Sequence, residues 1–146
     1  MLRRWRQWLA LPLADRMTTM AMAVALPTIS LGLSLFGYVR LRRWLERMSA
    51  RDTVRDATPD DIASAQRLAR LASIAGTHGP IEATCLRQSL LLHFLLRRKQ
   101  LAPELMIGVR KQDGAFDAHA WVQLGGVALG QQNLAHTALP DRPETA

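Results

Sequence analysis

The sequence is poor in cysteine, because Cys85 is the only one among 146 residues. A single cysteine excludes an internal disulfide and a zinc site built from several cysteines. It fits a reducing compartment such as the bacterial cytoplasm, where thiols stay free. A free cysteine is also often a small buried hydrophobe, so the residue alone says little about function. We expect neither a metal nor a cofactor.

Acidic residues are also few, since 12 aspartates and glutamates stand against 19 lysines and arginines, giving a net charge of +7. Such a balance suits nucleic acid, anionic lipid or an acidic partner. The sequence has no nucleic-acid-binding module, and its aromatic residues are not interleaved with basic ones. We therefore expect a solvated basic surface and no nucleic acid partner. Internal repeats and a phosphate-binding loop are missing as well.

Charge is absent from residues 17–39, a run of 23 residues that is long enough to cross a bilayer. Pro27 lies inside this run and is expected to break it into two shorter helices. We therefore prefer a buried helical hairpin, or a patch on one membrane surface, to a true span. Residues 1–16 carry arginines beside Trp5 and Trp8, which suits a membrane interface or packing on the domain equally well.

The length and the 49% apolar content predict one domain with a modest core. Residues 1–48 are expected to form a hydrophobic and basic helical region, and residues 49–57 a polar linker. Residues 58–135 form the predicted core. Residues 136–146 are expected to be a flexible tail.

A helix start is predicted at the beginning of the core. Thr58 can cap the helix, Pro59 fits the first helical position, and two aspartates follow at the positive end of the helix dipole. We expect Gly76 to end this helix.

The stretch from residue 84 to residue 131 organises the rest of the chain. A helix at residues 84–98 carries Cys85 in its first turn and is apolar on most faces, which is typical of a central buried helix. A buried strand follows at residues 105–110. Residues 117–124 then alternate between apolar and polar side chains, with His119 on the polar-aromatic face. Helices followed by strands indicate an α+β fold.

A thiol at a helix start and a histidine on a strand are the parts that papain-like chemistry needs. Backbone N–H groups and the dipole at the helix start favour the thiolate of Cys85. His119 can take the thiol proton and return it to the leaving amine. The backbone N–H of Cys85 is a candidate oxyanion donor. The alternative is a core cysteine and a histidine hydrogen-bonded within its sheet.

A third group is needed to orient the imidazole. A double-glycine turn follows the strand of His119. A three-residue loop places His119 opposite Gln131, and a two-residue loop places it opposite Gln132. Either glutamine can accept the Nδ1 hydrogen, although an amide cannot stabilise imidazolium as a carboxylate does. Asp117 is the alternative orienting residue, because it shares the face of His119.

Four motifs together resemble those of a known family: Cys85-Leu86-x-x-Ser89-Leu90, Leu95-Leu96-Arg97-Arg98, Ile107-Gly108-Val109 and Phe116-x-Ala118-His119-Ala120-Trp121-Val122. With them, residues 84–131 resemble the lasso-peptide leader peptidases, in the form of the stand-alone peptidase half of the split B protein. The segment is also similar to the C-terminal domain of the microcin J25 processing protein. The resemblance implies a transglutaminase-like, papain-related fold and a Cys-His-Asp triad. Cys85 and His119 match its nucleophile and base, whereas Gln131 stands where the family has its acid.

The resemblance also implies a substrate and partners. The family cleaves the leader from a ribosomally made precursor, which a separate small leader-recognition protein delivers. An ATP-using macrolactam synthetase then closes the ring. From the lone cysteine and the hydrophobic N-terminal region, we expect a cytoplasmic location with contact to the inner face of the cell membrane through residues 1–48.

Three other functions remain open from the sequence. A non-catalytic scaffold of the same maturation complex is favoured by Gln131, and a membrane-associated adaptor by residues 17–39. A transglutaminase or another acyl transferase would use the same cysteine and histidine, with an amine in place of water.

Overall fold

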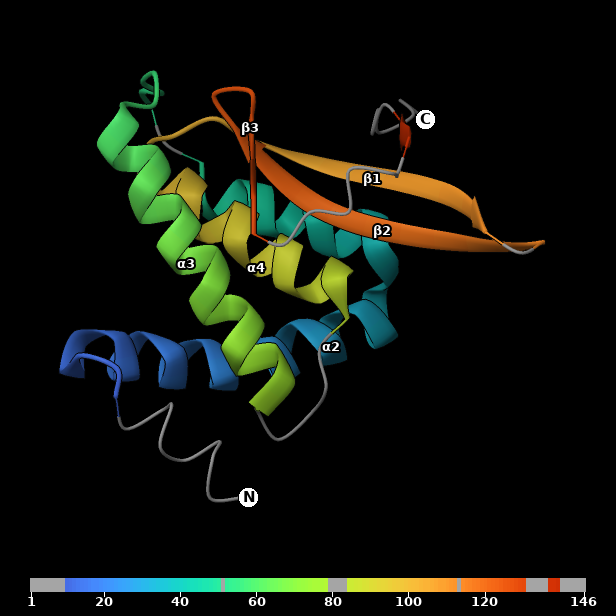
Figure 1. Cartoon of the computed structure of the whole chain (residues 1–146), viewed down its shortest axis with the longest axis horizontal. Coiled ribbons are helices and arrows are strands. Elements are labelled where there is room, and N and C mark those ends of the chain that lie inside the picture. The colour runs from blue at the N-terminus through green and yellow to red at the C-terminus, as the bar shows by residue number, and fades with distance from the viewer. Residues whose placement is uncertain (1–9, 51, 79–83, 113, 131–136, 140–146) are drawn as a thin grey trace.

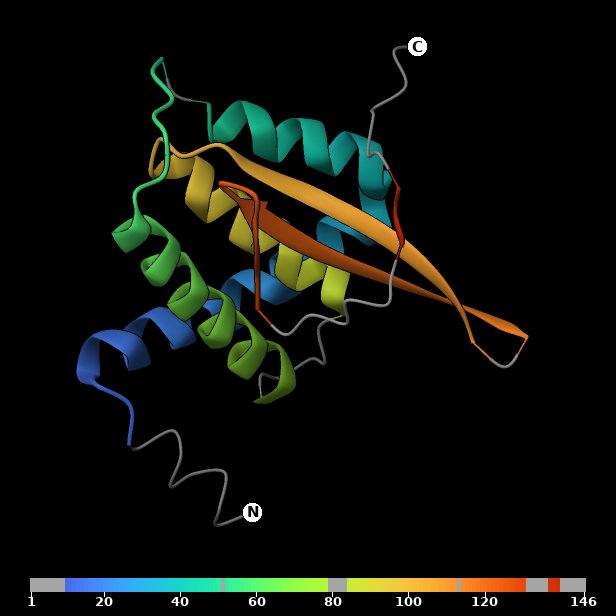
Figure 2. The same ribbon diagram turned by 45° about the horizontal axis from the view of Figure 1, so that its top comes forward.

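The computed structural model describes residues 10–50, 52–78, 84–112, 114–130 and 137–139. These residues form the helices α2 (Leu13–Met48), α3 (Pro59–His78) and α4 (Cys85–Arg98). They also form the strands β1 (Pro103–Gln112), β2 (Ala115–Leu124), β3 (Val127–Leu129) and β4 (Thr137–Leu139). Figure 1 shows α4 packed beneath the long hairpin of β1 and β2, whose far end extends beyond the helices in Figure 2 as well. This arrangement confirms the predicted α+β class.

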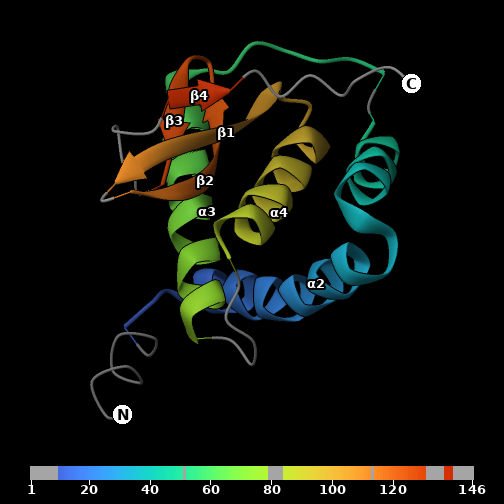
Figure 3. The ribbon, with the colours of Figure 1, turned by 90° about the vertical axis from the view of Figure 1, so that its right-hand side faces the viewer.

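Helix α2 changes direction at Gly37, not at Pro27, so the predicted position of the break is wrong. Pro27 keeps its place inside the helix, whereas Gly37 has φ 74° and ψ 169°. A positive φ ends the helical path, and glycine adopts it without a steric cost. Two arms result, residues 13–36 and residues 38–48, which run in different directions in Figure 3. The same view shows α4 between the sheet and the second arm.

Helix α3 begins as the sequence predicts. The Thr58 Oγ1 accepts a hydrogen bond from the Asp61 N–H at 3.2 Å, and the Asp61 carboxylate accepts one from the Thr58 N–H at 2.9 Å. This reciprocal pair is a capping box. The guanidinium of Arg55 donates to both oxygens of Asp61, at 2.5 and 2.8 Å. Hydrogen bonding from Arg55 is the main cause that holds the pKa of Asp61 well below the usual range, and the hydrogen bonds from Thr58 add to it.

The prediction that Gly76 ends α3 is wrong, because the helix continues to His78. Gly76 is buried where α3 meets α4, and a Cβ atom at this position would collide with the side-chain amide of Gln88. The glycine therefore serves close packing between two helices rather than a turn.

The sheet has the strand order β3-β2-β1-β4, and the pairs β1–β2, β2–β3 and β1–β4 are antiparallel. Gly125 and Gly126 form the two-residue turn between β2 and β3, with φ values of 58° and 76°. Positive φ at both positions is the mark of a type I′ hairpin turn. Strand β4 lies inside the predicted tail, so that prediction is wrong for residues 137–139, which pair with β1.

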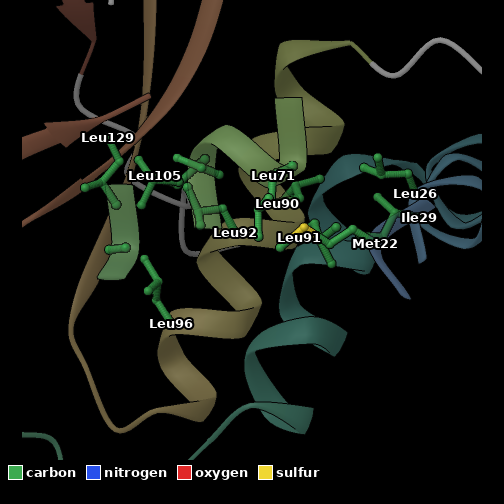
Figure 4. Close-up of a cluster of buried hydrophobic side chains, with 14 of the residues drawn as sticks. Met22, Leu26, Ile29, Leu71, Leu90, Leu91, Leu92, Leu96, Leu105 and Leu129 are labelled. Carbon is green, nitrogen blue, oxygen red and sulfur yellow. The ribbon is translucent and has the colours of Figure 1, made fainter. Parts of the chain in front are cut away.

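One hydrophobic core joins α2, α3 and α4 to the sheet. Figure 4 shows Met22, Leu26 and Ile29 of α2 next to Leu91 of α4, while Leu105 and Leu129 close the core on the sheet side. The hydrophobic N-terminal helix is therefore packed into the same core as the helix that carries Cys85.

Candidate functional site

Cys85 is the first residue of α4, so it lies in the first helical turn as predicted, and its side chain is half-buried. Thr84 precedes it in an extended conformation, with φ −63° and ψ 161°, and makes no side-chain capping bond. The Thr84 carbonyl accepts the first helical hydrogen bond from the Gln88 N–H at 3.1 Å. The N–H groups of a first helical turn have no partner within the helix, so they are placed to donate to an anion. The backbone N–H of Cys85 belongs to this turn.

A buried serine ties this end of α4 to β2. The Ser89 Oγ donates a hydrogen bond to the Ala120 carbonyl at 3.0 Å, and Ser89 is only 7% exposed. Ser89 lies four residues after Cys85, so both occupy the same side of the helix. Ala120 is the neighbour of His119 in β2. The backbone of the predicted base is therefore anchored one helical turn away from the predicted nucleophile.

The direction of α4 indicates which part of β2 lies beside Cys85. Its C-terminal end leads to Pro103, which pairs with Leu124 at the end of β2, so its N-terminal end points toward the start of β2. Going back from Ser89 to Cys85 covers about 6 Å of helix, which equals about two strand residues. Cys85 therefore comes level with Ala118 and His119.

His119 lies on the half-buried face of β2. Its ring stacks on Trp121, with the ring centroids 6.0 Å apart and an angle of 18° between the planes. Gly108 is the residue of β1 directly opposite His119. The stacked indole favours one orientation of the imidazole ring.

The other face of β2 points into the core. Ala120, Val122 and Leu124 are at most 5% exposed, and β2 pairs with β1 without interruption, so its side chains alternate strictly. Cys85 thus approaches β2 from its core side, whereas His119 projects from the opposite side. The structure brings the two residues to the same level of one strand, but onto different faces of it.

The length of the β2–β3 turn bears on which residue is the predicted third catalytic group. The two-residue turn is the register that continues to Gln132 opposite His119, but β3 ends at Leu129. Gln131 and Gln132 lie outside the described residues. Asp117 is part of β2 and pairs with Arg110 of β1.

Gln66 of α3 holds the chain just before this position, a role that the sequence did not suggest. Its Nε2 donates to the Ala128 carbonyl at 3.0 Å, and its Oε1 accepts from the Gly130 N–H at 3.0 Å. The amide thus bonds the outer edge of β3 as another strand would. Its partners lie more than 60 residues away along the chain, so no local pattern could have revealed it.

A second histidine, His93 of α4, is structural. It is 6% exposed, and burial, with the charges of Arg97 and Arg42, lowers its pKa from 6.5 to about 4. The carboxylate of Glu46 and a hydrogen bond with the Pro103 carbonyl act in the opposite direction. A neutral histidine enclosed between α2 and α4 is not placed to exchange protons with a substrate. His119 is therefore the better candidate for the base.

In the described part of the chain, the His, Cys, Asp and Glu side chains nowhere gather in groups of three or more that could hold an ion. Cys85, a free cysteine, remains the predicted nucleophile of the candidate site.

Comparison with known proteins agrees with this architecture. The family profile described as the transglutaminase-like superfamily matches residues 31–139, from the first arm of α2 to the end of β4. Neither the curated proteins nor the solved structures give a significant match. The superfamily includes cysteine peptidases and transferases. Because the match covers most of the 146 residues, the chain belongs to the transglutaminase-like superfamily.

Proposed function

We propose that this protein is a cysteine endopeptidase that removes the leader from a ribosomally made lasso-peptide precursor. The observation that carries the proposal is the bond from Ser89 to Ala120, which ties the helix that begins at Cys85 to the strand residue next to His119. Membership of a superfamily that includes cysteine peptidases supports the reaction class. The four sequence motifs around Cys85 and His119 support the substrate class.

The chemistry assigned to these residues is acyl transfer through a thioester. The thiolate of Cys85 attacks the scissile carbonyl, and the first-turn N–H groups of α4 stabilise the oxyanion. His119 gives its proton to the leaving amine, which breaks the C–N bond. Water, deprotonated by His119, then hydrolyses the thioester and frees Cys85. Gln131, or in its place Asp117, would orient the imidazole.

The proposed partners are a separate leader-recognition protein and a macrolactam synthetase. The recognition protein binds the leader and raises the local concentration of the scissile bond at Cys85. On precursor alone, the isolated peptidase is expected to be slow. Comparable rates with and without the recognition protein would contradict this division of labour.

A non-catalytic scaffold of the same maturation complex is the second candidate function. The observation in its favour is that His119 and the core-facing Ala120 project from opposite faces of β2, while Cys85 approaches from the core side. The amide at Gln131, where the resembled family has its catalytic acid, also favours the scaffold. The sequence motifs around Cys85 and His119 and the match to a superfamily that includes cysteine peptidases keep the peptidase as the leading proposal.

Replacement of the nucleophile tests the proposal. Precursor, recognition protein and either the wild-type chain or Cys85→Ala are mixed, and intact masses are read over time. We expect cleavage by the wild-type chain and none by Cys85→Ala, with equal thermal unfolding of both. Normal cleavage by Cys85→Ala would end the peptidase hypothesis. A wild-type chain that cleaves nothing, yet is required for ring closure by the synthetase, would establish the scaffold.

A further inference from the structure

The first arm of α2 carries an exposed apolar stripe. Its members are each more than half exposed and are spaced four, three, four, seven and four residues apart: Leu13, Met17, Met20, Val24, Leu31 and Leu35. At 100° per residue this spacing keeps them within a narrow strip of the helix surface. The strip runs from Leu13 to Leu35, and the rise between these two residues is about 33 Å of helix. An apolar surface of this length is unusual on a water-exposed helix.

The opposite side of the same arm is closed by the domain. Met22, Leu26 and Ile29 are buried in the core against α3 and α4. Asp15 accepts hydrogen bonds from the guanidinium of Arg67 on α3, at 2.7 and 3.0 Å. With one side packed against the protein, lipid could reach this helix only from the stripe side. The arm is therefore placed to lie along a membrane surface rather than to cross it.

A groove continues the stripe at its C-terminal end. It has a volume of about 670 Å³ and lies between the two arms of α2. The first arm lines it with Leu31, Leu35 and Phe36, and the second arm with Trp44 and three arginines, Arg40, Arg43 and Arg47. These arginines and Trp44 occupy one side of the second arm, because their spacing is three, one and three residues. Apolar and cationic surfaces thus meet along one groove.

We propose that α2 docks this protein onto an anionic phospholipid surface. The apolar stripe enters the boundary between headgroups and acyl chains, as the apolar face of an interfacial helix does. The arginines of the groove bind lipid phosphates beside it, and the indole of Trp44 lies at headgroup level. The net charge of +7 favours approach to a negative surface over a neutral one. The site of Cys85 and His119 uses none of these residues, so docking leaves it free.

Vesicle sedimentation of the full chain tests the proposal with matched variants. Val24 in the stripe is 72% exposed, and Val54 outside α2 is 63% exposed, so Val54→Glu controls for the same substitution at a similar exposure. Arg70, exposed on α3, provides Arg70→Gln as the control for Arg43→Gln. Vesicles contain either phosphatidylcholine alone or a mixture with phosphatidylglycerol. Thermal unfolding of each variant is recorded to verify that it folds.

The wild-type chain is expected to bind the anionic vesicles, less strongly at high salt, and the neutral vesicles weakly. Val24→Glu should weaken partitioning about tenfold or more, and Arg43→Gln about fivefold, while both control variants bind like the wild type. Carbonate is expected to extract the protein. Absence of binding, equal binding to neutral vesicles, or retention after carbonate would overturn the proposal. A dimer that Val24→Glu converts to a monomer would overturn it too, because a second copy would then cover the stripe.

Discussion

The two ends of α4 are held very differently. At the C-terminal end, His93 is buried between α2 and α4, and the Arg97 Nε donates to the Ser49 Oγ at 3.1 Å. Ser49, itself 1% exposed, donates to the Leu45 carbonyl at 2.7 Å. At the N-terminal end, Cys85 is half-buried, and Ser89 makes the described bond to β2. One end is thus built into the core, whereas the other is half-buried, so the proposed peptidase would separate stability from chemistry along a single helix.

The largest expected effect separates the two histidines. His119→Ala should reduce single-turnover leader cleavage at least a hundredfold, because it removes the acid-base group. His93→Ala should leave cleavage by the folded fraction nearly unchanged but lower the free energy of unfolding by about 2–4 kcal/mol, since it opens a cavity in the core. Urea unfolding and cleavage assays on both variants measure the two effects. If His93→Ala were the inactive and stable variant, the assignment of roles would be reversed.

His93 should also make stability depend on pH. Its folded pKa of about 4 lies below the unfolded value of 6.5, so the unfolded chain binds a proton first as the pH falls. The free energy of unfolding is therefore highest above pH 6.5. It falls as the pH drops toward 4, by about 3 kcal/mol in total. Urea midpoints from pH 7 to pH 4 measure the loss. His93→Leu should flatten this part of the profile, whereas His119→Ala should keep it.

Local chemistry accounts for what the sequence predicted correctly. The capping pair of Thr58 and Asp61 and the double-glycine turn at Gly125 act over a few residues, so their patterns are readable. Gly37 was missed in favour of Pro27, because a proline costs a long helix one hydrogen bond, whereas a positive φ ends the helical path. Strand β4 was missed because pairing with β1 depends on distant partners.

The candidate site divides in the same way. The place of Cys85 at a helix start follows from the sequence around it, and so does the shared face of His119 and Trp121. The relation of Cys85 to His119 depends on how α4 packs on β2, which no local pattern encodes. The hydrogen bond from Ser89 to Ala120 joins residues 31 positions apart, so it depends on the folded chain and not on a local pattern.

Two buried serines give the next comparison, one at each end of α4. Ser89→Ala removes the buried hydrogen bond to Ala120, and Ser49→Ala removes the bond to the Leu45 carbonyl together with the bond from Arg97. Ser89→Ala should cost about 1–2 kcal/mol of unfolding free energy, and Ser49→Ala at least as much. Ser89→Ala alone should also reduce the rate of cleavage, by about tenfold, because it loosens the turn that positions Cys85. The first-order cleavage rate measured as a function of pH distinguishes an effect of Ser89→Ala on positioning from an effect on proton transfer. Equal rates for the two variants would show that Ser89 does not position the thiol.

The smallest effects are expected at the third catalytic position. An amide at Gln131 can fix the imidazole tautomer of His119, but it stabilises imidazolium less than a carboxylate does. Exchange of the acid for an amide has cost as much as ~10⁴ in rate in a serine enzyme, where a wrong tautomer contributed. A cysteine enzyme should lose less, since its thiol ionises more readily. Gln131→Asp is therefore expected to keep or raise the single-turnover rate, and Gln131→Ala to lower it.

Asp117→Asn is the matched test at the alternative orienting residue, and it should change the rate less than Gln131→Ala does. Asp117 lies two residues before His119 along β2, and its partner on β1 is Arg110. The two-residue turn at Gly125 and Gly126 adds a further variant, because its register leads to Gln132 opposite His119. Loss of activity in Gln132→Ala, with Gln131→Ala unchanged, would assign the orienting role to Gln132. Loss in Asp117→Asn alone would assign it to the strand of His119 itself.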